Sequence, residues 1–76
     1  MAEGVIKWFH SVLGYGAIAP DDGSPVVLLD AEVAKQAGLS RPSKGDRLGF
    51  DSVRGTSGRV WATNLRVAPA AAQGSL

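Results

Sequence analysis

Few residues of this chain have the types and spacing that catalysis requires. The single histidine, His10, has no cysteine to activate and no carboxylate close to it in the sequence. The adjacent acids Asp21 and Asp22 precede a glycine, which is typical of a turn rather than of a general acid–base pair. The glycines Gly14 and Gly16 are too few for a dinucleotide fingerprint, and no helical segment follows them. The sequence therefore predicts a binding protein rather than an enzyme, with no cofactor and no metal ion.

The composition narrows the class of protein further. With 76 residues the chain can form one domain, and without cysteine it cannot be a disulfide-stapled module or a thiolate metal site. No apolar run could span a membrane and the first residues do not resemble a signal peptide, so we expect a soluble, cytosolic monomer. The formal net charge is only +1. A nucleic-acid-binding domain with so little charge would need shape and stacking for much of its affinity.

Glycine, proline, aspartate and serine divide the chain into short apolar segments, a pattern typical of an all-β domain. Five strands this short can hide a common apolar face by closing into a small antiparallel barrel of the OB-fold kind. We expect this domain to occupy residues 1–67 and to be followed by a disordered tail, residues 68–76. The expected strands are residues 5–9, 14–19, 26–29, 47–53 and 59–67, with a short helical turn at residues 30–37 between strands three and four.

Side-chain alternation predicts which residues face outward. In the second strand it directs Tyr15 and Ala17 to the outside and Ile18 to the core. In the third strand it directs Leu28 and Asp30 outward, and Asp30 could also cap the helical turn. Tyr15 is a good candidate for ligand contact, because its flanking glycines allow close approach and a phenol between glycines is poor core material.

Several segments resemble the bacterial cold shock domain, and together they extend from residue 4 to residue 67. The segment GVIKWF (residues 4–9) is similar to the family's opening strand GxVKWF, LGYGAI (13–18) to its RNA-binding motif KGFGFI, and PDDGS (20–24) to the turn that follows. The segment VLLDA (27–31) occupies the place of the second RNA-binding motif, VFVHF. The last two segments, KGDRLGF (44–50) and ATNL (62–65), are similar to EGQKVSF and AANV.

The resemblance implies an OB-fold that binds single-stranded RNA or DNA. In that family, outward aromatic side chains of the two motifs form a surface on which unpaired bases stack, and the family's roles are RNA chaperone and transcription regulator. Stacking contributes about 1–3 kcal/mol per base with little sequence preference, and a duplex hides the base faces that a single strand exposes. The candidate binding residues in this chain are Lys7, Trp8, Phe9, His10, Tyr15, Leu28, Arg59 and Trp61.

The chain departs from the family's pattern at its aromatic positions. Phenylalanines of the family are replaced by Ala17, Leu28 and Ala31, a histidine is replaced by Asp30, and a lysine by Leu13. Losing three stacked rings would cost roughly 3–9 kcal/mol if the losses were additive, and neighbouring sites rarely are. We therefore predict weak binding. The rival hypothesis is a protein-interaction module, in which Leu28, Ala17 and Ala31 form an apolar patch for a protein partner.

Two interpretations remain open for the tryptophans. Strict alternation places Trp8 in the core with Ile6, whereas the resemblance places it on the surface, which a bend in the first strand would permit. We favour the surface, and one of Trp8 and Phe9 must then fill the interior. Trp61 shares parity with Leu65, which favours a cap on the core; alternatively, it rebuilds part of the aromatic surface from a neighbouring strand.

The polar candidates have simpler expectations. His10 is expected in a solvated loop, with a base contact as the alternative. Lys7 and Arg59 could meet phosphates of a bound strand. The remaining loop and helix cations, Lys35, Arg41 and Lys44, are expected to form a solvated face.

Overall fold

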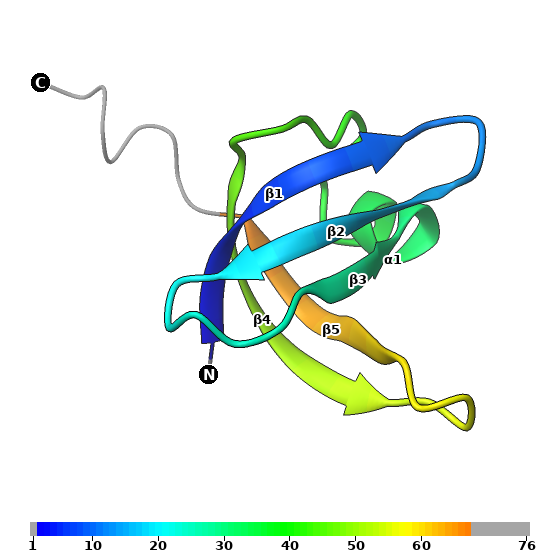
Figure 1. Ribbon diagram of the computed structural model, residues 1–76. Helices are drawn as coiled ribbons and strands as arrows, with labels where there is room; N and C mark the ends of the chain where they lie inside the picture. The colour runs from blue at the N-terminus through cyan, green and yellow to red at the C-terminus, as the bar shows by residue number, and fades with distance from the viewer. Residues whose placement is uncertain (1, 68–76) are drawn as a thin grey trace, which may run out of the picture.

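Five strands and one short helix follow one another in the part of the chain that the structure describes. The structure, a computed structural model, describes residues 2–67, and the predicted tail at residues 68–76 lies outside this range. The strands close into a barrel in the order β1-β2-β3-β5-β4 (Figure 1), which confirms the predicted all-β architecture. The elements are β1 (Ala2–His10), β2 (Tyr15–Pro20), β3 (Val27–Asp30), α1 (Ala31–Gln36), β4 (Arg47–Arg54) and β5 (Val60–Val67).

One pairing of the barrel differs in direction from the other four. The pairs β1/β2, β1/β4, β2/β3 and β4/β5 are antiparallel, whereas β3 and β5 are parallel and meet at Leu28 and Trp61. Parallel neighbours need a crossover connection. Here α1, the loop after it and β4 provide that connection. The short helix α1 thus begins the crossover, directly after the last residue of β3.

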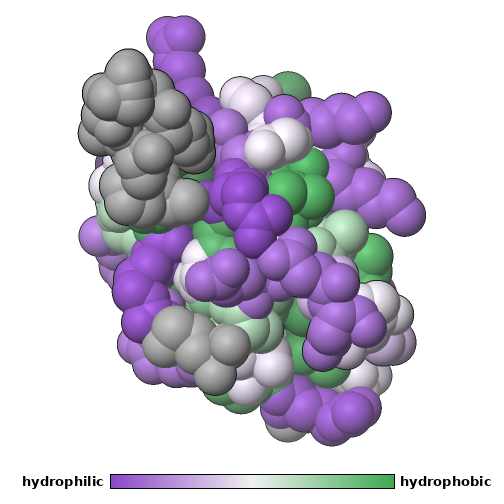
Figure 2. All heavy atoms as spheres, turned by 90° about the vertical axis from the view of Figure 1, so that its left-hand side faces the viewer, coloured by the Kyte–Doolittle hydropathy of each residue, from purple (hydrophilic) through white to green (hydrophobic). Residues whose placement is uncertain are grey.

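The barrel interior is apolar. Its largest fully buried side chains are Phe50, Ile6, Ile18, Leu29 and Leu48, each exposed by 1% or less. Alternation along β3 is as predicted, because its two inward residues are buried and its two outward residues are partly exposed. Hydrophilic side chains cover much of the face shown in Figure 2, with hydrophobic side chains visible between them. Within residues 2–67, no helix is long and apolar enough to cross a membrane.

Strand β1 contains a bulge that interrupts its alternation. Ile6 pairs with Ile18, but Trp8 pairs with Ala17, so two steps along β1 correspond to one step along β2. A bulge leaves one extra residue unpaired and bends the strand. As a result, Lys7 and Trp8 are both exposed although they are adjacent.

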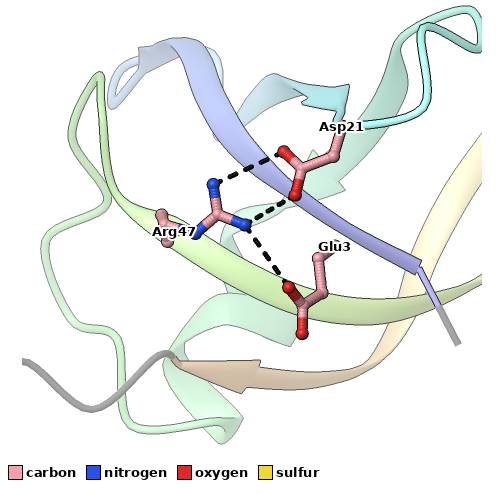
Figure 3. A network of polar contacts seen from close by, with 3 residues as sticks. All are labelled: Glu3, Asp21 and Arg47. Carbon is pink, nitrogen blue, oxygen red and sulfur yellow. Dashed lines mark hydrogen bonds and ion pairs between the residues drawn. The ribbon is translucent and has the colours of Figure 1, made fainter. Parts of the chain in front are cut away.

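An exposed arginine network joins the start of β4 to β1 and to the turn after β2 (Figure 3). The guanidinium of Arg47 lies 2.6 Å from Asp21 Oδ2 and 3.3 Å from Glu3 Oε1. The hydrogen bond and charge of Asp21, with a smaller effect of Glu3, raise the pKa of Arg47. Because all three side chains are exposed, salt will screen this network, and its effect on stability is small. The network does determine the local charge: the cation of Arg47 is already paired with two carboxylates.

Gly16 is required for the close approach of β2 to the bulged end of β1. A Cβ atom at this position would overlap the carbonyl oxygen of Trp8 and lie 2.9 Å from the Cα of Phe9. Backbone atoms cannot move aside without shifting β1, so we expect Gly16→Ala to lower the free energy of unfolding by about 1–3 kcal/mol, measured by urea denaturation.

Gly49→Ala is the matched control for this substitution. Gly49 is also in a strand, but the nearest atom to a Cβ there, apart from its chain neighbours, would be Arg66 Nε at 3.7 Å, an ordinary contact. We expect Gly49→Ala to unfold at nearly the same urea concentration as the original chain. An equal loss of stability in both variants would contradict the overlap at Gly16.

Candidate nucleic-acid interface

Four aromatic side chains form a row on the outside of the barrel, which we call the aromatic row. The ring of Trp8 lies edge-on to His10, with centroids 6.3 Å apart, and edge-on to Tyr15, with centroids 5.6 Å apart. Tyr15 lies 6.4 Å from Trp61 at a tilt of 59°. These spacings are in the range of favourable aromatic pairs, about 4.5–7 Å. The row therefore connects β1, β2 and β5 through direct ring contacts.

The bulge in β1 explains the position of the first tryptophan. Trp8 is 37% exposed, so the alternative that placed it in the core with Ile6 is wrong. Phe9 is partly buried and packs against the core instead. Of the two adjacent aromatic residues, the structure thus puts one outside and the other against the interior. Phe9, although predicted in the binding site, does not belong to the aromatic row.

A second bulge explains the position of Trp61. Asn64 has a positive φ of 49°, and the register of β5 against β4 shifts by one residue at this point. Before the bulge Ala62 belongs to the core, and after it Leu65 packs against the core, so the parity of inward residues changes. The expectation that Trp61 caps the core was based on unbroken parity and is wrong. Trp61 is half-buried on the outer face, beside Tyr15.

A groove of about 380 Å³ lies beside the aromatic row, and we call it the central groove. It is lined by Trp8, Tyr15, Val26, Leu28 and residues 58–60. Its volume is within the range of ligand-binding pockets, about 300–1,000 Å³. The groove thus combines aromatic and aliphatic walls with one cation, Arg59, on the turn between β4 and β5. Such a lining suits a flat, apolar ring that is attached to an anionic group.

Three lining residues of the central groove, Val26, Gly58 and Val60, were not among the predicted site residues. Val26 precedes β3 and is 43% exposed, and Val60 begins β5. Both lie in expected strands, residues 26–29 and 59–67, and membership of a strand carries no information about a shared groove. They meet because β3 and β5 are neighbours, and that pairing was not predicted.

The proposed apolar patch for a protein partner is not continuous. Ala17 is only 1% exposed, although it lies outside the core cluster and pairs with Trp8 and Leu28. Its methyl group therefore lies on the outer side of β2 but beneath the larger side chains of its neighbours. Leu28 lines the central groove, whereas Ala31 lines a different pocket. The three residues of the rival hypothesis do not form one exposed surface.

The predicted polar residues lie beside the aromatic row or within it. Lys7 is exposed next to Trp8 in β1, and Arg59 is exposed at the central groove. His10 is the last residue of β1 rather than part of a loop, and its exposed ring contacts Trp8. A strand bound along the row would pass one cation beside Trp8 and another at the central groove.

Asp30 is both the neighbour of Tyr15 and the cap of α1. It pairs with Tyr15 across β2 and β3, and its Oδ1 accepts a hydrogen bond of 2.7 Å from the backbone N–H of Glu32. This confirms the predicted N-cap. The helix end offsets part of the carboxylate's charge, but an acidic group remains beside the aromatic row.

The cap predicts how substitutions of Asp30 affect stability. Asparagine caps helices about as well as aspartate, whereas alanine costs about 0.5–2 kcal/mol. We expect Asp30→Asn to leave the thermal unfolding midpoint nearly unchanged and Asp30→Ala to lower it. Gln36→Ala is the control, because Gln36 is an exposed residue at the other end of α1, away from the cap. If Asp30→Ala were as stable as the original chain, the capping contribution would be refuted.

Comparison with known proteins gives relatives along nearly the whole chain, although no protein-family model matches it. The chain is 42% identical over 69 residues to the cold shock protein CspA of Rhizobium meliloti (strain 1021), covering 90% of this chain and 100% of the relative. It is 37% identical over 67 residues to the probable cold shock protein y4cH of Sinorhizobium fredii, covering 87% and 97%. It is 36% identical over 58 residues to the major cold shock protein of Micrococcus luteus, covering 76% and 87%.

Proposed function

The chain belongs to the cold shock protein family, and on that premise we propose that it binds single-stranded RNA or DNA weakly, by base stacking along the aromatic row and in the central groove. The observation that supports this most directly is the exposed ring of Trp8, which lies edge-on to Tyr15 at the wall of the groove. Unpaired bases present flat faces that such rings can stack on, with little dependence on sequence.

Each residue of the interface has a distinct role in this proposal. Trp8 and Tyr15 stack on bases, and Trp61 extends the stacking surface toward β5. Leu28 forms an apolar wall of the groove, where it can contact a base without stacking. Arg59 meets phosphate groups at the groove. Beside Trp8, His10 contacts a base and Lys7 a phosphate, while Phe9 packs between the row and the core.

Weak binding suits the proposed biological role. Leu28 supplies no ring, Asp30 adds a negative charge beside Tyr15, and the net charge of the chain is only +1. A monomeric RNA chaperone or transcription regulator in the cytoplasm must release the strands that it holds open, so it does not need high affinity. The relatives are named for cold shock, which supports a place for this chain in the response to stress.

The direct test is a titration of the protein with oligothymidine at low salt, followed by tryptophan fluorescence. We expect the strand to quench the fluorescence, because a stacked base lies against Trp8. The variants Trp8→Ala and Tyr15→Ala should each weaken binding by about 1–3 kcal/mol, which is about tenfold for every 1.4 kcal/mol.

Two variants and one ligand serve as controls. Tyr15→Phe keeps the ring and should bind like the original chain, and Val67→Ala removes a 40% exposed apolar side chain at the far end of β5. A duplex of the same base composition should compete poorly. An absence of quenching at millimolar oligothymidine, or full binding by Trp8→Ala, would overturn the proposal.

The charge of Asp30 gives a second prediction about binding. Asp30→Asn keeps the helix cap but removes the carboxylate beside Tyr15, so a phosphate chain is repelled less. At separations of about 4–8 Å in water one unit charge is worth about 0.5–1 kcal/mol, so affinity should rise roughly two- to fivefold at low salt. The gain should shrink as salt is added. An unchanged affinity at low salt would show that the strand does not pass Asp30.

A further inference from the structure

A second pocket, of about 450 Å³, lies between the end of β1, α1 and the loop after α1. We call it the basic pocket. It is lined by Phe9, Ser11, Ala31, Lys35 and residues 40–42, which include Ser40 and Arg41. Two of these side chains are cations and two are hydroxyl groups, while none of the lining residues is acidic. This donor set is suited to a phosphate group.

The two cations of the basic pocket are available for a ligand. Lys35 lies in the last turn of α1, Arg41 lies in the following loop, and both are exposed. Within residues 2–67 neither forms an ion pair, and Glu32, one turn earlier in α1, does not pair with Lys35. The backbone carbonyl of Arg41 accepts a hydrogen bond from Ser43 Oγ at 3.2 Å, which helps to fix the loop. Arg41 therefore differs from Arg47, which already faces two carboxylates.

The basic pocket adjoins the aromatic row through the chain itself. Phe9 directly follows Trp8, and Ser11 directly follows His10. Ala31, the first residue of α1, directly follows Asp30, the partner of Tyr15. Consecutive Cα atoms are about 3.8 Å apart, so the pocket begins about one residue beyond the row. A strand that leaves the row past His10 reaches the basic pocket next.

We propose that the basic pocket holds the phosphate backbone of the same single strand, with Lys35 and Arg41 as its cationic contacts. This inference rests on the proposed function of the aromatic row and extends its footprint to α1. Arginine can donate two parallel hydrogen bonds to a phosphate, and lysine acts as a point charge. In this chain, contacts to phosphate thus replace stacking at the end of the interface where Ala31 offers no ring.

The salt dependence of binding tests the inference quantitatively. Each phosphate contact to a single strand contributes about −0.7 to the slope of log affinity against log salt concentration. We expect Lys35→Ala and Arg41→Ala each to reduce the steepness of this slope by about 0.7, measured with oligothymidine between about 50 and 200 mM salt. Both side chains are exposed, so the urea midpoints of the variants should match that of the original chain.

Lys44→Ala is the matched control, because it removes the same charge from an exposed lysine outside the pocket lining. Its slope should stay close to that of the original chain. If Lys35→Ala and Arg41→Ala behaved like Lys44→Ala while Trp8→Ala still weakened binding, the basic pocket would be refuted and the proposed function would survive. If the original chain did not bind oligothymidine at all, the proposed function and the basic pocket would both be refuted.

Discussion

One extra residue in β1 determines which aromatic ring of this protein faces solvent. Because the bulge lies between Ile6 and Trp8, the tryptophan turns outward and the next residue, Phe9, turns toward the core. Gly16 permits this arrangement, since any side chain there would collide with the backbone of β1. Without the bulge, the contact between Trp8 and Tyr15 would not exist, and the central groove would lose its aromatic wall.

Much of the fold follows from local patterns in the sequence, whereas the second half of the interface does not. The five apolar segments, the Asp30 cap and the inward residues of β3 each have a signal within a few residues. The bulge at Asn64 has no such signal, because it depends on the register of β5 against β4, and it decides the face of Trp61. The parallel contact between β3 and β5 likewise depends on how the whole barrel closes.

The burial of Ala17 was unpredictable for a related reason. Alternation gives the direction of a side chain but not the height of the side chains around it. Between Trp8 and Leu28, the methyl group of Ala17 is buried although it lies outside the core cluster. A small residue at a binding surface can therefore be covered by its neighbours. Replacing it with a larger residue would displace those neighbouring side chains.

The seam between β3 and β5 gives the proposed ligand a mechanical role. Those two strands meet in register at a single pair, Leu28 and Trp61. We therefore expect the barrel to open locally most easily between β3 and β5. The contact between Tyr15 and Trp61 bridges the same line from outside. A molecule bound across the rings of Tyr15 and Trp61 would hold β3 and β5 together. As more of the protein is bound, the seam would therefore open less often.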